Sequence, residues 1–207
     1  MNNRNRSLLG LGMALAAGAV GAQATKGPSQ VVKPPVAQAW IDVATFAGFG
    51  VPGMGGGTFH SRVEPELLGY REGSPEYAGL FAAWCRAVEA HLRAKGWLDR
   101  AFVYWFDEPD PKDYAFVMNG FRKLREAAPG IRRMLTEQPE KELFGGPNIW
   151  CAITPEYRHE AAEERRKHGE KFWWYVCTGP KASYAGLFID HPAPEMRLWL
   201  WQTFQRN

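Results

Sequence analysis

The stretch AFVYWFDEP, residues 101–109, decides the fold that we predict for this chain. It opens with a run of apolar and aromatic residues, which leads directly into Asp107 and Glu108 and then Pro109. A continuous apolar run of this length is typical of a strand that is covered on both faces, as in the parallel sheets of α/β proteins. The sequence therefore predicts a buried strand whose carboxyl end carries an acidic pair.

This acidic pair is the strongest candidate for a functional site. In α/β barrels the catalytic residues lie at the carboxyl ends of the strands, where Asp107 and Glu108 are expected. Two neighbouring like charges favour protonation of one group, and a protonated acid beside an ionised one can supply what glycoside cleavage needs. The pair can face one pocket only if the strand twists or bulges at its end. The structural alternative is a helix N-cap followed by a solvated glutamate.

Strands and helices alternate along the rest of the chain, which predicts a parallel sheet with right-handed crossovers. Besides the central strand, strands are predicted at residues 40–46, 131–136, 148–154 and 171–177. Helices are predicted to begin at Ser74 and Asp110, to cover about residues 156–168, and to begin again near Pro194. About five parallel strands are fewer than the eight of a closed (β/α)8 barrel. The fold class is therefore α/β, a partial TIM-barrel-like sheet with no strand after its last helix.

The start of the chain has the pattern of an export signal. Residues 1–24 contain an arginine-bearing start, a short apolar middle and a small-residue cleavage site, so we expect a signal peptide and a secreted or periplasmic protein. Residues 25–37 are expected to form a linker, and residues 38–207 the folded domain. The net charge is only +3, and the basic residues are interspersed with acidic ones instead of forming a basic stripe, which argues against nucleic acid as a partner. Beyond the signal peptide no membrane association is predicted.

Other residues at predicted strand ends are candidates for lining a sugar site, because aromatic rings suit the apolar faces of sugars and carboxylates suit their hydroxyl groups. The candidate substrate-binding residues are Glu137, Trp150, Tyr175 and Asp190, the last followed by His191. Each has a structural alternative: Trp150 can belong to the core, Glu137 can cap a helix and His191 can hold a turn. The loop GFGVPGMGGG, residues 48–57, lacks the pattern of a phosphate-binding loop and is expected at the mouth of a site.

Several segments together resemble the catalytic domain of glycoside hydrolase family 123 and its less characterised relatives. They are YWFDEPDPKDY, RRMLTEQP, NIWCAITPEY, GEKFWWYVCTGP and FIDHPAPEMRLWLWQT, with the loop AGFGVPGMGGGTF, and they span roughly residues 38–205. The resemblance implies a barrel fold and a β-N-acetylgalactosaminidase that uses an adjacent Asp-Glu pair in a retaining mechanism assisted by the acetamido group of the substrate. It implies that Glu108 protonates the glycosidic oxygen and that Asp107 orients and stabilises the acetamido group.

The chain departs from that family in extent, because the early barrel strands and the last strand are not found in its sequence. We therefore expect a truncated or internally deleted product, with a glycan as substrate and with no cofactor or metal. A catalytically inert fragment or a sugar-binding module is the alternative. A metallohydrolase that uses His60, Asp107, Glu108 and His191 is a third hypothesis, although these histidines lack the spacing of metal ligands. An open sheet edge favours dimerisation or aggregation, and the oligomeric state stays open.

Overall fold

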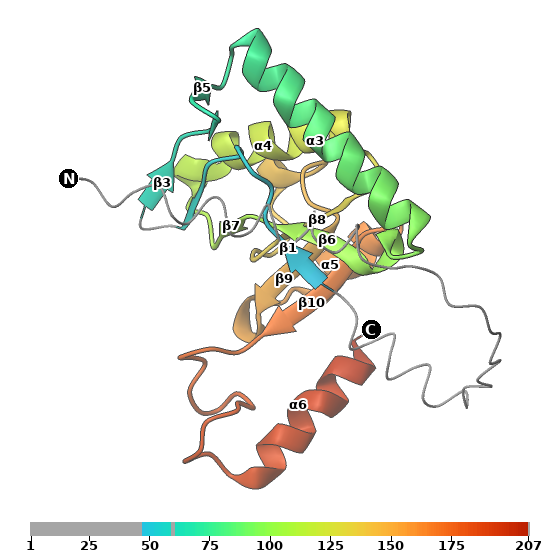
Figure 1. Ribbon diagram of the computed structural model, residues 1–207. Helices are drawn as coiled ribbons and strands as arrows, with labels where there is room; N and C mark the ends of the chain where they lie inside the picture. Colours follow the sequence, from blue (N-terminus) through green and yellow to red (C-terminus); the bar gives the residue numbers. More distant parts are fainter. Residues whose placement is uncertain (1–46, 59–60, 207) are drawn as a thin grey trace, which may run out of the picture. The chain divides into compact units, whose positions relative to one another are not determined.

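The structure is a computed structural model that describes residues 47–58 and 61–206 (Figure 1). Its main sheet has five strands in the order β1-β6-β8-β9-β10, and all of its strand pairs are parallel. The strands are β1 Ala47–Phe49, β6 Ala101–Tyr104, β8 Arg132–Leu135, β9 Ile149–Ile153 and β10 Lys171–Tyr175. This confirms the predicted α/β fold, a partial TIM-barrel-like sheet flanked by helices. The strand predicted at residues 40–46 lies outside the described residues.

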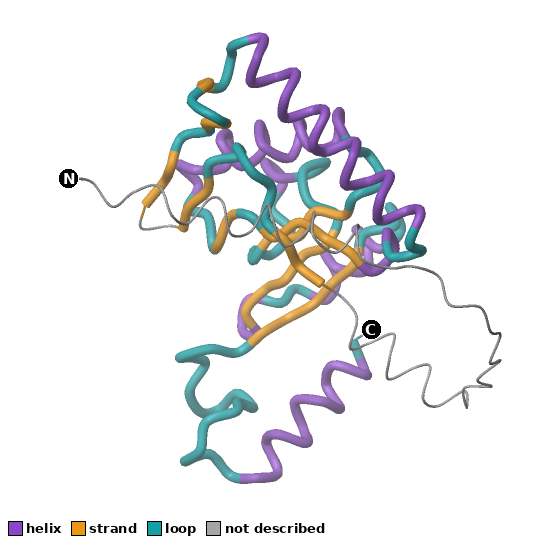
Figure 2. Tube along the Cα trace, in the orientation of Figure 1, coloured by secondary structure: helices purple, strands orange, loops and turns teal. Residues whose placement is uncertain are grey.

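Four α-helices are described (Figure 2), and the first of them has an N-terminal cap from a side chain. They are α3 Pro75–Ala94, α4 Tyr114–Ala127, α5 His159–Arg166 and α6 Ala193–Gln205. The Ser74 hydroxyl accepts a hydrogen bond from the Tyr77 backbone N–H at 3.2 Å and so caps α3. Single turns of 3-10 helix are η1 Leu98–Arg100, η2 Pro111–Asp113, η3 Lys141–Leu143 and η4 Thr154–Glu156.

The helix predicted at residues 156–168 is shorter than expected. It is split into η4 and α5, because the backbone at Tyr157 and Arg158 is extended between them. Among the helices in the described part of the chain, none combines the length and the apolar character that a membrane span requires.

The main sheet is apolar on both faces, as the continuous apolar runs predict. On one face, Val103 packs with residues of α3 and α4, while Leu135 and Trp150 join a second cluster with α4 and α5. On the other face, Phe102 and Met134 form a third cluster with Ile149, Cys151 and Trp173. Residues along each strand alternate between these two layers. Because the strands are parallel, their carboxyl ends all lie at the same end of the sheet, which is where α/β barrels carry their catalytic residues.

The central strand is interrupted, which corrects the prediction of one continuous buried strand. After β6 the chain kinks at Trp105 and continues as β7, Phe106–Asp107, which pairs with β2, Gly56–Thr58, rather than with the main sheet. The indole of Trp105 packs so closely over Gly120 of α4 that a Cβ there would lie 2.2 Å from the ring. Tyr104, just before the kink, is 37% exposed instead of buried.

Two short antiparallel strand pairs complete the described fold. Strand β3, Ser61–Val63, pairs antiparallel with β2, so that the small sheet has the order β3-β2-β7. Strands β4, Glu66–Leu67, and β5, Tyr70–Arg71, form a separate antiparallel pair. The glycine-rich loop therefore leads into a strand that lies directly beside Asp107, since Thr58 is its register partner.

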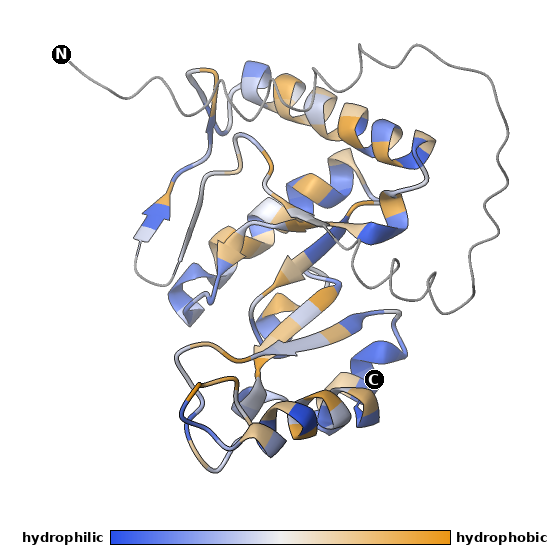
Figure 3. Ribbon diagram, turned by 60° about the horizontal axis from the view of Figure 1, so that its bottom comes forward, coloured by the Kyte–Doolittle hydropathy of each residue, from blue (hydrophilic) through white to orange (hydrophobic). Residues whose placement is uncertain are grey.

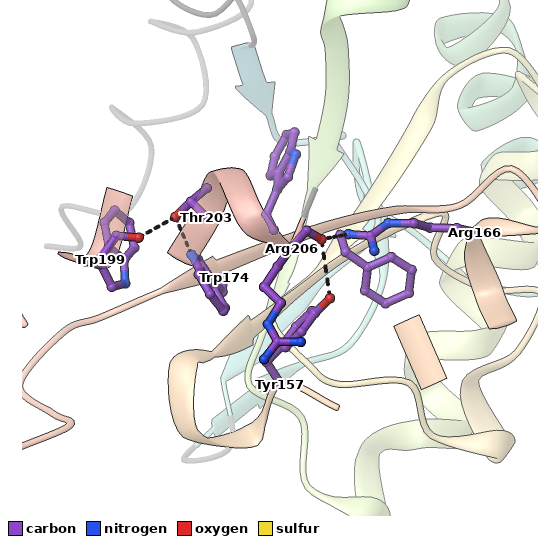
Figure 4. Close-up of a pocket in the computed structure, with 8 residues that line it drawn as sticks. Tyr157, Arg166, Trp174, Trp199, Thr203 and Arg206 are labelled. Atoms are coloured by element: carbon purple, nitrogen blue, oxygen red, sulfur yellow. Dashed lines mark hydrogen bonds between the residues drawn. The ribbon is translucent and has the colours of Figure 1, made fainter. Parts of the chain in front are cut away.

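Helix α6 contacts the edge strand β10 through a small group of polar and aromatic side chains (Figure 4). The Trp174 indole N–H donates to the Thr203 hydroxyl at 2.8 Å, and the rings of Trp174 and Trp199 lie 6.5 Å apart. A cavity of about 240 Å³ remains between these residues, α5 and Arg206. Helix α6 is rich in apolar residues (Figure 3), and five of its large apolar side chains are exposed, namely Met196, Leu198, Leu200, Trp201 and Phe204.

Candidate active site

Asp107 and Glu108 lie at the carboxyl end of β7, where the backbone changes direction. Asp107 is the last residue of the strand, and Glu108 has a φ of +46°, in the left-handed region that non-glycine residues seldom adopt. This turn breaks the alternation that would send neighbouring side chains to opposite faces. Strained residues of this kind cluster at active sites, where the surrounding structure holds them. The departure at the strand end that the sequence analysis required is therefore present.

Three hydroxyl groups from two neighbouring strands and the edge strand hold the acidic pair. The Thr136 hydroxyl donates to Asp107 Oδ1 at 3.0 Å and accepts from the Glu108 backbone N–H at 2.8 Å. The Tyr104 hydroxyl donates to the same Oδ1. The Tyr175 hydroxyl, from the end of β10, donates to Glu108 Oε1. The parallel register of β6, β8, β9 and β10 brings these side chains to one edge of the sheet.

Each carboxyl group thus has one oxygen that the protein holds and one that it leaves open. Within residues 47–58 and 61–206, neither Asp107 Oδ2 nor Glu108 Oε2 has a hydrogen-bond partner, and no lysine, arginine or histidine pairs with either group. All of the side-chain donors are neutral hydroxyls. Two half-buried carboxyl groups without a cationic partner in this part of the chain suit a ligand that carries or develops positive charge.

The two tyrosines remain hydrogen-bond donors over the physiological pH range. Burial raises the pKa of Tyr175 far above its ordinary value, and the hydrogen bond to Glu108 raises it further. Burial likewise raises the pKa of Tyr104, with a further contribution from its hydrogen bond to Asp107. Both phenols therefore stay protonated and keep their hydroxyl hydrogens directed at the carboxylates.

A cavity of about 900 Å³ begins one residue beyond the pair. Its walls come from the segment after Glu108, from the first turns of α4 and from the segment after Thr136, and they include Pro109, Tyr114, Glu137 and Glu140. Asp107 and Glu108 border this cavity in sequence but are not among its lining residues. Its walls combine apolar surface with several carboxyl groups, which is typical of a small-molecule site.

Glu137, predicted to line the site, does line this cavity. Burial raises the pKa of Glu137 to about 7, and the nearby Glu140 carboxylate adds to the increase. The Gln138 backbone N–H donates to Glu137 Oε1 at 2.9 Å, the Tyr114 hydroxyl donates to Oε2 at 3.5 Å, and both bonds oppose the increase, as does Arg158. This carboxyl group is therefore partly protonated near neutral pH.

The raised pKa of Glu137 makes the free energy of unfolding depend on pH. Since the folded state binds this proton more tightly than the unfolded state, stability decreases as pH rises from 4.5, the ordinary pKa, through about 7. We expect Glu137→Gln to weaken that decrease. The measurement is the difference in melting temperature between about pH 5, where the folded protein keeps the proton, and about pH 8, where it has lost it. Glu142→Gln removes an exposed carboxylate from the same cavity and is the control. An unchanged pH dependence in Glu137→Gln would refute the assignment.

The other residues predicted for substrate binding have different positions. Tyr175 is beside Glu108, as described above, whereas Asp190 is exposed in the turn before α6 and forms no hydrogen bond or ion pair within the described residues. His191 bonds through Nδ1 to Glu195 Oε2 at 2.7 Å. Trp150 corrects the prediction of a sugar platform: it is fully buried, and its indole N–H donates to Glu170 Oε2 at 2.5 Å. The alternation of β9 points this ring toward the helices.

Sequence reasoning did not find Tyr104 and Thr136. Tyr104 was counted in the apolar run, although its position three residues before Asp107 could have indicated a contact if the kink at Trp105 had been known. Thr136 directly follows β8, the strand next to β6 in the sheet, so its place beside the pair is consistent with the strand order. His60 lies outside the described residues, and among residues that are described no group of His, Cys, Asp and Glu is arranged to hold a metal ion.

Comparison with known proteins identifies the family. A solved structure of a family 123 glycoside hydrolase from Clostridium perfringens, analysed for glycolipid glycan hydrolysis, shares 15% sequence identity at a TM-score of 0.49; the match covers 69% of this chain and 25% of that enzyme. The chain thus spans about a quarter of the length of that relative. None of the curated proteins compared with the chain matches it. The family of the glycoside hydrolase 123 catalytic domain matches residues 61–207, which is more than half of the chain, and the chain belongs to that family.

Proposed function

We propose that this domain cleaves β-linked N-acetylhexosaminides, with N-acetylgalactosaminides favoured, by a retaining mechanism that the acetamido group of the substrate assists. The observation that carries the proposal is the acidic pair: two adjacent carboxyl groups, each anchored through one oxygen by neutral hydroxyls and open at the other. Membership of the glycoside hydrolase 123 family supports a glycan as the substrate.

In the proposed first step, Glu108 donates a proton to the glycosidic oxygen as the bond to the anomeric carbon breaks. The acetamido oxygen attacks that carbon, and the acetamido N–H donates to the open oxygen of Asp107. Positive charge develops on the sugar ring and then on the cyclic intermediate. Among the described residues no cation pairs with Asp107 or Glu108. The carboxylate of Asp107, and that of Glu108 once it has given up its proton, can therefore stabilise this positive charge.

In the second step, Glu108 acts as a base and removes a proton from water as the water attacks the anomeric carbon. Two displacements at the same carbon restore its configuration, which gives net retention. The neutral Tyr175 hydroxyl can remain hydrogen-bonded to Glu108 Oε1 through both steps, because it does not have to change its protonation state. We further propose, from the signal-peptide pattern of residues 1–24, that the reaction takes place outside the cytoplasm.

A pair of aryl glycosides tests the proposal. The protein should hydrolyse an aryl N-acetyl-β-galactosaminide at least about 100-fold faster than the matching aryl β-galactoside, because only the first carries its own nucleophile in position. A thiazoline that mimics the cyclic intermediate should inhibit competitively. Equal turnover of the two substrates would exclude assistance by the acetamido group. Thiazoline binding without hydrolysis would instead identify a sugar-binding module, the alternative drawn from the sequence.

A further inference from the structure

Thr136 is the one residue in the described part of the chain that bonds to both members of the acidic pair. It contacts the side chain of Asp107 and the backbone of Glu108, through the same hydroxyl oxygen. It directly follows Leu135, the last residue of β8, the strand adjacent to β6, and is half-buried. A rigid strand of the main sheet therefore fixes the relative position of two groups that sit on an irregular turn.

The chemistry of the hydroxyl fixes the direction of both hydrogen bonds. A threonine hydroxyl has one hydrogen and two acceptor sites. The Glu108 backbone N–H can only donate, so the Thr136 oxygen accepts from it at 2.8 Å. The hydroxyl hydrogen is then free to be directed at Asp107 Oδ1, 3.0 Å away, which is an acceptor when ionised. Thr136 therefore holds the side chain of Asp107 and the backbone of Glu108, while the Tyr175 hydroxyl holds the Glu108 carboxyl group.

The same contact supports the left-handed backbone at Glu108. A residue with a φ of +46° and a Cβ is strained and persists only where surrounding contacts over-determine it. The bond from its N–H to Thr136 is such a contact, and Thr58 of β2 pairs in register with Asp107 on the other side. Loss of the Thr136 hydroxyl would free the turn to relax and would move the two carboxyl groups relative to each other.

We propose that Thr136 is a positioning residue that sets the geometry of Asp107 and Glu108, an inference that rests on the proposed function of that pair. The hydroxyl does not contact the reacting atoms in this role. It acts by holding Oδ1 of Asp107 in place, so that Oδ2 is presented to the ligand, and by holding the turn that orients the Glu108 carboxyl group.

The test compares Thr136→Val, which keeps the shape and removes the hydroxyl, with Thr136→Ser, which keeps the hydroxyl. Two quantities are measured: kcat and KM on an aryl N-acetyl-β-galactosaminide, and hydrogen exchange of the Glu108 backbone amide by NMR in the ligand-free protein. The valine variant should lose about 100-fold in kcat with a smaller change in KM, because misplacement of catalytic groups acts on the chemical step. Its Glu108 amide should exchange at least about tenfold faster. The serine variant should remain close to the wild type in both.

The outcomes separate this proposal from the one on which it rests. Wild-type kcat together with wild-type protection of the Glu108 amide in the valine variant would overturn the positioning role. If the wild type itself does not hydrolyse the substrate, the proposed function fails, and the exchange rates alone decide whether Thr136 holds the turn. Should the valine variant fail to melt cooperatively, Thr136→Ala removes the hydroxyl without adding a methyl group and replaces it in both measurements.

Discussion

The variant Glu108→Gln should hydrolyse an aryl N-acetyl-β-galactosaminide about 1,000-fold more slowly than the wild type, since general acid-base catalysis contributes on the order of 100- to 10,000-fold. Glutamine keeps the shape of the side chain and can still accept a hydrogen bond from the Tyr175 hydroxyl. It cannot supply an acidic proton to the glycosidic oxygen. The loss should therefore appear in kcat, while binding of the thiazoline inhibitor changes little.

The leaving group gives this prediction a second, sharper readout. A dinitrophenyl glycoside leaves as a stable anion and needs no proton, so Glu108→Gln should affect its release much less than that of a simple phenyl glycoside. Glu126→Gln, which removes an exposed carboxylate from α4, is the matched control and should leave both rates unchanged. Equal losses on the two substrates would mean that Glu108 is not the proton donor, and no loss on either would remove it from the mechanism.

The second large effect is expected in the core, at Trp150. Its ring is fully buried between β9 and the helices, and its indole N–H bonds to Glu170, which Arg165 Nε also contacts at 3.0 Å. Truncation of a buried tryptophan to alanine costs about 3–5 kcal/mol. Because small domains are stable by about 5–15 kcal/mol in total, Trp150→Ala should remove a large share of the free energy of unfolding.

Circular dichroism melting curves would measure this effect against two comparison variants. Trp150→Phe keeps most of the apolar surface but removes the donor to Glu170, so its melting temperature should fall between those of Trp150→Ala and the wild type. Trp201→Ala removes a side chain that is 68% exposed and should change stability by no more than about 0.5 kcal/mol. A Trp150→Ala variant that melts with the wild type would show that the ring is not part of the core.

The fold class could be predicted from the sequence because its signals are local. The apolar runs that form β6 and β9 are continuous, and Ser74 marks the start of α3 with an N-cap that the structure confirms. The kink at Trp105 could not be predicted in the same way. It depends on the absence of a side chain at Gly120, in a helix that follows the strand, and on pairing with a strand that precedes it. Neither relation leaves a pattern within the stretch itself.

The site was predictable where the chemistry is unusual and not where it is ordinary. Two adjacent acids before a proline attract attention, and the strand-end rule placed Tyr175 near them before the contact with Glu108 was known. A threonine at the end of a strand carries no such signal, so Thr136 emerges only from the strand order. Trp150 was placed at the site as an aromatic residue at a strand end, whereas it is the second residue of β9 and the alternation along that strand turns it toward the helices.

The left-handed turn at Glu108 has a consequence for how such a domain can change over generations. Glycine, and to a lesser degree asparagine, would adopt this backbone with less strain than glutamate does, by on the order of 1 kcal/mol. If Glu108 is the proton donor that we propose, selection for stability and selection for hydrolysis act in opposite directions at this position. A related domain without hydrolytic activity should then carry a residue here that tolerates the left-handed backbone.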